Sequence, residues 1–114
     1  MTALTINRLT DEVCASPQLA AEDMKTVAAA GFRSVVNNRP DLEGGPAQPT
    51  SAAIEAQAKA AGLAYAYLPV HPAIQSAEEA AALGRLVATL PKPILLFCRS
   101  GTRSTKLFNA SQAL

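Results

Sequence analysis

Apolar and polar positions along the chain predict short buried strands that alternate with helices. Runs rich in β-forming or apolar residues lie at Val13 to Ser16, Phe32 to Asn38, Leu63 to Val70 and Ile94 to Phe97. Helical patterns lie at residues 19–30, 50–61, 76–89 and 103–113. Strands that alternate with helices of this length are typical of βαβ units around a mostly parallel sheet.

Turn and capping residues support these boundaries. Gly31 and Gly62 each lie where a glycine commonly ends a helix. Ser76 and Glu79 have the spacing of a capping box, which marks the start of a helix. Arg39 to Pro49 contains three prolines and two adjacent glycines and is therefore predicted to be a loop. We expect an α/β fold of three layers, with a mostly parallel sheet of four to five strands between helices.

Composition narrows the class of protein further. The 114 residues are the size of one domain, which we place at residues 1–114, either complete or part of a longer fusion protein. Ten basic and nine acidic residues leave a net charge of +1. The sequence lacks the cluster of basic residues that binding to nucleic acid would require. We expect no membrane span and no export signal, and therefore a cytoplasmic protein with reduced thiols. One histidine and two distant cysteines predict no metal site, and we expect no cofactor.

Candidate chemistry lies in the segment from Cys98 to Arg103. The preceding apolar strand would deliver Cys98 to the carboxyl edge of the sheet, where open α/β folds place their ligands. Gly101 gives the backbone freedom for a sharp turn into the next helix. Loop amides, the helix dipole, Arg99 and Arg103 would all favour the thiolate of Cys98. A buried structural cysteine beside surface arginines is the alternative.

Several segments resemble known proteins. The segment CRSGTRS, residues 98–104, resembles the active loops of rhodanese-type sulfurtransferases and of cysteine-dependent protein phosphatases. Together with Ser16-Pro17, GFRSVVNNRPD (31–41) and GLAYAYLPV (62–70), it makes nearly the whole chain similar to the phosphatase-like domain of the beta-lactamase-hydrolase-like family. This resemblance implies a fold like that of cysteine phosphatases. It also implies frequent fusion to a persulfide dioxygenase or another sulfide-oxidising enzyme.

Three departures from the phosphatase pattern favour sulfur chemistry. Only four residues separate Cys98 from Arg103, as in rhodanese-type loops, whereas phosphatases of this type have five. Phe97 precedes the nucleophile where phosphatases usually have histidine. The loop after GLAYAYLPV lacks the aspartic acid that would protonate an ester's leaving group, a contribution worth about 10²–10⁴-fold.

The function expected from these departures is sulfur transfer. The Cys98 thiolate would take the sulfane sulfur of thiosulfate or of glutathione persulfide, and Arg99 and Arg103 would hold the anionic leaving group. Cyanide, sulfite or glutathione would then accept the sulfur in a ping-pong cycle. The alternative is a cysteine-dependent phosphatase with a phosphocysteine intermediate, in which Asp41 or His71 acts as a substitute acid. An alternative of another class is a non-catalytic module that binds anions or senses oxidants.

The remaining candidate residues surround the nucleophile. Backbone amides of Ser100, Gly101 and Thr102 are expected to bind an anionic group of the substrate. Ser104 follows the arginine, where the phosphatase resemblance implies a hydroxyl that stabilises the thiolate. Arg39 ends a predicted parallel strand and is expected either to line the mouth of the site or to be a solvated turn residue.

Overall fold

The computed structural model describes residues 4–114. Its elements follow the chain in the order β1 (Asn7–Arg8), β2 (Val13–Ser16), η1 (Ala21–Asp23), α1 (Met24–Ala29), β3 (Ser34–Asn37), α2 (Ser51–Ala60), β4 (Ala64–Tyr67), α3 (Ala77–Thr89), β5 (Ile94–Phe97) and α4 (Thr102–Gln112).

The five strands form one sheet in the order β1-β2-β5-β3-β4. All neighbouring strands run parallel except β1, which pairs antiparallel with β2 at the edge. Strand β5 is central, and its Ile94 lies opposite both Val13 and Ser34. Every residue of β5 is buried, as its continuous apolar run predicts for a parallel strand covered on both faces. The predicted fold class is confirmed.

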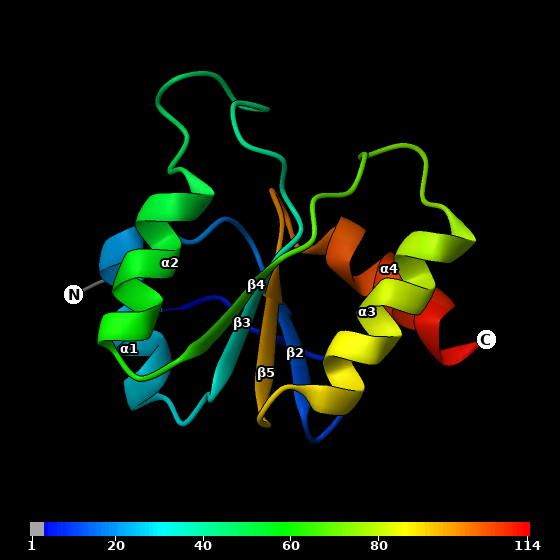
Figure 1. Ribbon diagram of the computed structural model, residues 1–114, viewed down its shortest axis with the longest axis horizontal. Helices are drawn as coiled ribbons and strands as arrows, with labels where there is room; N and C mark the ends of the chain where they lie inside the picture. The colour runs from blue at the N-terminus through cyan, green and yellow to red at the C-terminus, as the bar shows by residue number, and fades with distance from the viewer. Residues whose placement is uncertain (1–3) are drawn as a thin grey trace.

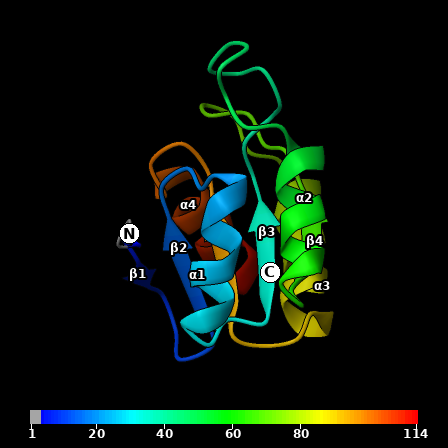
Figure 2. The same cartoon turned by 90° about the vertical axis from the view of Figure 1, so that its left-hand side faces the viewer.

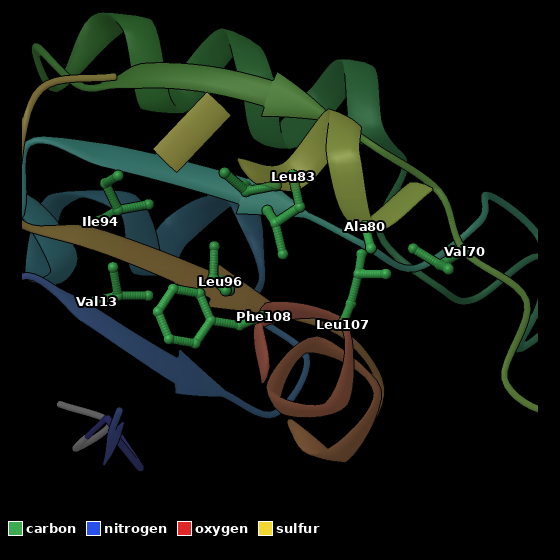
Figure 3. Close-up of a cluster of buried hydrophobic side chains, with 9 residues drawn as sticks. Val13, Val70, Ala80, Leu83, Ile94, Leu96, Leu107 and Phe108 are labelled. Carbon is green, nitrogen blue, oxygen red and sulfur yellow. The ribbon is translucent and has the colours of Figure 1, made fainter. Parts of the chain in front are cut away.

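Helices cover both faces of the sheet and give the fold three layers. The helices α1 and α2 pack on one face, and α3 and α4 pack on the other (Figures 1 and 2). Each face of the sheet has its own apolar core. Figure 3 shows the core under α3 and α4, in which Val13, Ile94 and Leu96 of the sheet contact Leu107 and Phe108 of α4. Successive residues of β5 point to opposite faces, so that alternate side chains supply the two cores.

Three differences separate the structure from the sequence prediction. The predicted helix over residues 19–30 is a 3-10 turn followed by the short helix α1. The predicted strand 63–70 is paired only over β4, and its last residues continue as a loop through Pro69, which has no amide hydrogen to donate to a sheet ladder. The edge strand β1 was not predicted, because two polar residues carry no periodic signal.

The parallel strands direct four loops to the same edge of the sheet. The loops after β3 (residues 38–50) and β4 (residues 68–76) rise at the top of Figure 1, and the short loop after β5 (residues 98–101) leaves the same edge below them and enters α4. The segment after β2 reaches this edge as well, since the amide of Gln18 donates to the carbonyl of Arg99 at 3.2 Å. The candidate residues predicted from the sequence therefore gather at this edge.

Candidate active site

Cys98 directly follows β5 and is only 1% exposed. The amide of Gly101 donates to its Sγ at 3.0 Å. Burial raises the pKa of the Cys98 thiol, but hydrogen bonds from Ser104 and from the amides of Gly101 and Ser100 outweigh it and hold the pKa below its usual value. The loop thus favours a thiolate through these hydrogen bonds, whereas the sequence prediction also invokes the charges of Arg99 and Arg103.

Ser104 connects the thiol to a buried asparagine. Its hydroxyl lies close enough to Cys98 to lower the pKa of the thiol, yet in this structure it donates to Oδ1 of Asn38 at 2.8 Å. A hydroxyl has one proton, so donation to a thiolate requires the hydroxyl to turn away from Asn38. The side chain of Asn38 is held in its place when the Ser104 hydroxyl turns, because its Nδ2 donates to the carbonyl of Leu68 at 2.9 Å.

Gly101 closes the loop against the segment that follows β2. Its φ of +93° is a left-handed conformation that favours glycine, and it caps the start of α4. A Cβ at this position would lie 3.4 Å from the carbonyl group of Ser16. The backbone of Ser16-Pro17, a pair that is part of the family resemblance, therefore packs directly against the Cys98 loop at Gly101.

Arg103, in the first turn of α4, is fixed by residues outside its own loop. Its side chain is 7% exposed; Nη1 and Nη2 donate to the two carboxylate oxygens of Glu43, each at 2.9 Å. Nη1 also donates to the carbonyl of Val70 at 3.0 Å. A guanidinium has five N–H groups, and the two that remain are on Nε and Nη2, which form a side-on fork for a second oxyanion. Nε is buried and has no partner within residues 4–114.

Glu43 is a positioning residue for two arginines. Besides Arg103, it accepts from Nε of Arg39 at 2.9 Å. The hydrogen bond from Arg103 outweighs desolvation, and together with Arg39 it lowers the pKa of the Glu43 carboxyl below its usual value. Glu43 therefore stays ionised at neutral pH, orients Arg103, and is a poor proton donor.

Two open cavities meet above this cluster. One, of about 200 Å³, is lined by Pro72, Cys98, Arg99, Ser100, Thr102, Arg103 and Lys106. The second, of about 490 Å³, is lined by Arg39, Glu43, Gly44, Pro72, Arg99 and Arg103. Because they share Pro72, Arg99 and Arg103, the nucleophile and the buried guanidinium open into one region rich in positive charge.

Known proteins show which family the chain belongs to. A family model described as the phosphatase-like domain of beta-lactamase hydrolase-like proteins matches residues 5–114. The chain belongs to this family. The resemblance found in the sequence is thereby confirmed, and the residues matched include every loop at the candidate site.

Curated relatives of this phosphatase-like domain are much longer than the chain. A beta-lactamase hydrolase-like protein from Xylella fastidiosa is 34% identical over 106 residues, which cover 93% of this chain and 24% of that protein. One from Agrobacterium fabrum is 34% identical over 115 residues, which cover 100% of this chain and 26% of that protein. The chain thus spans about a quarter of the length of these relatives.

Solved structures agree with the family. A "putative phosphatase" from Neisseria meningitidis has a TM-score of 0.83 and 30% identity, with 90% of this chain and 72% of that chain covered. TpbA from P. aeruginosa has a TM-score of 0.62 and 17% identity, with 86% of this chain and 55% of that chain covered. The likeness to TpbA shows the fold alone, which is that of cysteine phosphatases.

These relatives correct the functional prediction made from the sequence. The prediction of a rhodanese-like sulfurtransferase is wrong, because the family and its relative of known structure carry phosphatase names, which favours the alternative. The prediction relied on three departures, namely Phe97 before the cysteine, the missing aspartic acid and the four-residue spacing between Cys98 and Arg103. That spacing does not by itself set the size of the anion site, since Glu43 and Val70, outside the loop, fix the arginine.

The two candidate acids lie in different places. The carboxylate of Asp41 accepts from the amide of Ser51 at 2.8 Å and is thereby held at the start of α2. His71 is exposed, next to Pro72, which lines both cavities, and its Nδ1 accepts from the amide of Ala73 at 3.1 Å. Neither acid itself lines the two cavities, and His71 differs from Asp41 in being the chain neighbour of a residue that lines both.

Sequence reasoning missed three residues that organise the site. Glu43, Asn38 and Gln75 all bond to the Cys98–Ser104 segment, Gln75 through its Nε2 to the carbonyl of Arg103 at 2.9 Å. The segment NNRPD was noticed for its resemblance, and it does carry Asn38 and Arg39 into the site. No periodic or spacing signal marks Glu43, which lies three residues beyond Pro40 in an irregular loop.

Within the described residues 4–114, no helix is long and apolar enough to cross a membrane. A cytoplasmic location stays a prediction, as does fusion to a persulfide dioxygenase or another sulfide-oxidising enzyme.

Proposed function

We propose that this domain is a cysteine-dependent phosphatase that hydrolyses phosphate monoesters through a phosphocysteine on Cys98. The observation that carries the proposal is the unpartnered Nε of Arg103, a residue that lines the same cavity as a thiol of lowered pKa. A guanidinium fork fits two oxygens of a phosphoryl group, and a thiolate is the nucleophile that such an ester requires. The phosphatase names of the relatives support the same reaction.

The reaction proceeds in two displacements at phosphorus. The Cys98 thiolate attacks the phosphorus atom, a sulfur–phosphorus bond forms, and the bond to the ester oxygen breaks. Arg103 and the loop amides at Ser100, Gly101 and Thr102 stabilise the charge on the equatorial oxygens. Water then attacks the phosphocysteine, which releases inorganic phosphate and regenerates the thiolate.

The leaving group decides which esters are good substrates. The one carboxylate that lines these cavities, Glu43, is held ionised by two arginines and cannot supply a proton readily. A phenolate leaves without full protonation, whereas an alkoxide does not. We therefore propose aryl phosphates, phosphotyrosine among them, as the preferred class, with His71 as the candidate acid for poorer leaving groups.

Hydrolysis of p-nitrophenyl phosphate, combined with mass analysis of acid-quenched protein, tests this proposal. We expect turnover and a transient gain of one phosphoryl group on the peptide that contains Cys98. The Cys98→Ser variant should lose both, while Cys14→Ser, the same change at the other cysteine, should keep both. An inert protein, or a Cys98→Ser variant as active as the parent, would reject the phosphatase and leave the non-catalytic anion-binding or redox-sensing module.

A further inference from the structure

A second cavity adjoins the one that Cys98 lines, and its lining residues carry a net positive charge. Arg39, Arg99 and Arg103 line it together with a single carboxylate, that of Glu43. With three guanidiniums and one carboxylate, the lining has a net charge of +2. The cavity of about 490 Å³ is larger than the neighbouring one of about 200 Å³ that contains Cys98.

Two of these arginines share one oxygen of Glu43. Nε of Arg39 and Nη2 of Arg103 both donate to Oε1, each at 2.9 Å. The side chain of Arg39 is only 12% exposed, so its charge is largely removed from water. A cation removed from water needs a counter-charge of its own. One shared carboxylate supplies half of what this pair requires, and an anionic ligand would supply the rest.

Arg39 also has hydrogen-bonding capacity to spare. Besides the bond to Glu43, its Nη1 donates to Oε1 of Gln18 at 3.2 Å. In the part of the chain that the structure describes, residues 4–114, Nη2 has no protein acceptor. A Cβ on Gly44 would lie 2.6 Å from Nη2, so a side chain at position 44 would make the guanidinium shift from its place against this loop.

We propose that the cavity between Arg39 and Arg99 is a second anion subsite, and that the preferred substrates are phosphate monoesters with a second anionic group. This inference rests on the proposed function, because it places the scissile phosphate at the free fork of Arg103. The second group, a carboxylate or another phosphate, lies between Arg39 and Arg99. The shared Pro72 and Arg99 make the two subsites continuous, so one small molecule or side chain can reach both.

Matched aryl phosphates test the subsite by hydrolysis. We compare kcat/KM for phenyl phosphates substituted at position 3 or 4 with a carboxylate or with a carboxamide, which has the same shape without the charge. A 1,3-phenylene bisphosphate tests phosphate as the second group. A charge-assisted hydrogen bond in a partly buried site predicts a preference of about tenfold for at least one doubly anionic ester.

Substitution of Arg39 shows whether this residue causes the preference. In Arg39→Met the ratio of kcat/KM between the carboxylate and carboxamide esters should fall toward the part that Arg99 alone supports, and Arg39→Lys should recover some of the loss. Any effect of the substitution through Glu43 on Arg103 lowers both rates and cancels in this ratio. Arg33→Met, at the opposite end of β3, should keep the full preference. An unchanged ratio in Arg39→Met overturns the subsite.

Binding to Cys98→Ser, measured by calorimetry with the same esters, separates the two proposals. Tighter binding of the doubly anionic esters, lost in Cys98→Ser/Arg39→Met, supports the subsite even where no ester is hydrolysed by the parent protein. Hydrolysis by the parent together with equal binding of charged and neutral esters rejects the subsite and keeps the phosphatase.

Discussion

The loops that follow β3 and β4 flank the Cys98 loop at the same sheet edge, and they are built differently. Residues 38–50 form an internally bonded loop, in which Gln48 donates to the carbonyl of Pro40 and accepts from the amide of Gly44. Residues 68–76 are fastened at their two ends, by Val70 and by Gln75, while residues 71–74 between them are exposed.

Arg103 is the point at which both loops meet. Its side chain donates to the carboxylate of Glu43 in the first loop and to the carbonyl of Val70 in the second. Its own carbonyl accepts from Gln75. The first loop therefore holds Arg103 in place before any anion binds. The second loop contributes a main-chain anchor and leaves its central residues free for the substrate or for proton transfer.

Arg103→Lys is expected to have the largest effect after loss of the nucleophile. Lysine keeps the charge but has no planar fork, so it cannot hold Glu43 and two phosphoryl oxygens together. We expect kcat/KM for p-nitrophenyl phosphate to fall by about 10²–10³-fold, the usual cost of removing an oxyanion donor. Arg33→Lys, the same substitution at an exposed arginine just before β3, should retain the parent rate. A loss below tenfold would show that the fork does not bind the transition state.

Glu43→Gln tests whether the first loop positions Arg103. Glutamine keeps one acceptor oxygen but loses the charge that two arginines share, so both guanidiniums gain freedom. We expect kcat/KM to fall by about tenfold to a hundredfold, the range for small displacements of a catalytic group. Glu55→Gln, which removes only the exposed pair with Lys59, is the matched control. Equal rates in the two variants would make Glu43 a surface partner and not a positioning residue.

Much of this architecture could be predicted from the sequence because it follows from local patterns. The apolar run Ile94–Phe97, the capping box at Ser76 and the glycine at position 101 each specify a local conformation, and all three appear in the structure. They suffice to place Cys98 at the carboxyl edge of a central strand. For this reason Cys98 and Arg103 line one cavity at the expected edge, while their roles in catalysis stay a prediction.

What the sequence could not predict depends on contacts between distant residues. Glu43 and Arg103 are 60 positions apart, and Asn38 and Ser104 are 66 positions apart. Such pairs have no periodicity, and they arise only once the parallel strands bring their loops to one edge. The spacing argument for sulfur chemistry is wrong on the same point, because it infers the size of the anion site from the Cys98 loop without the distant residues that hold Arg103.

Ser104→Ala should cause a moderate loss of kcat/KM at low pH, which tests the hydrogen bond from Ser104 to the thiol. Loss of the hydroxyl removes one hydrogen bond to the thiolate and raises the pKa of Cys98, so the acid limb of the kcat/KM profile moves to higher pH. We expect roughly a twofold to tenfold loss at pH 6, the worth of one ordinary hydrogen bond. Ser111→Ala, which removes a buried hydroxyl bonded to Phe108 in the same helix, should leave the profile unmoved.

The same pKa has a consequence for stability, whose sign is fixed by linkage. Folding lowers the pKa of Cys98 below its value in the unfolded chain, so the native thiol releases its proton first. The free energy of unfolding therefore rises with pH between the two values, and this contribution is lost as pH falls through the lower one. Denaturant titrations of the parent and Ser104→Ala across this interval should show a smaller rise in the variant.

His71→Gln should have the smallest effect on p-nitrophenyl phosphate and should reveal what the second loop contributes. Nitrophenolate leaves unaided, so we expect a loss below about threefold with this ester, and about tenfold with phenyl phosphate, whose leaving group gains more from a proton. His71 is the chain's one histidine, so the substitution leaves the protein without an imidazole. Equal losses with both esters would remove His71 as the acid and leave residues 71–74 with a binding role only.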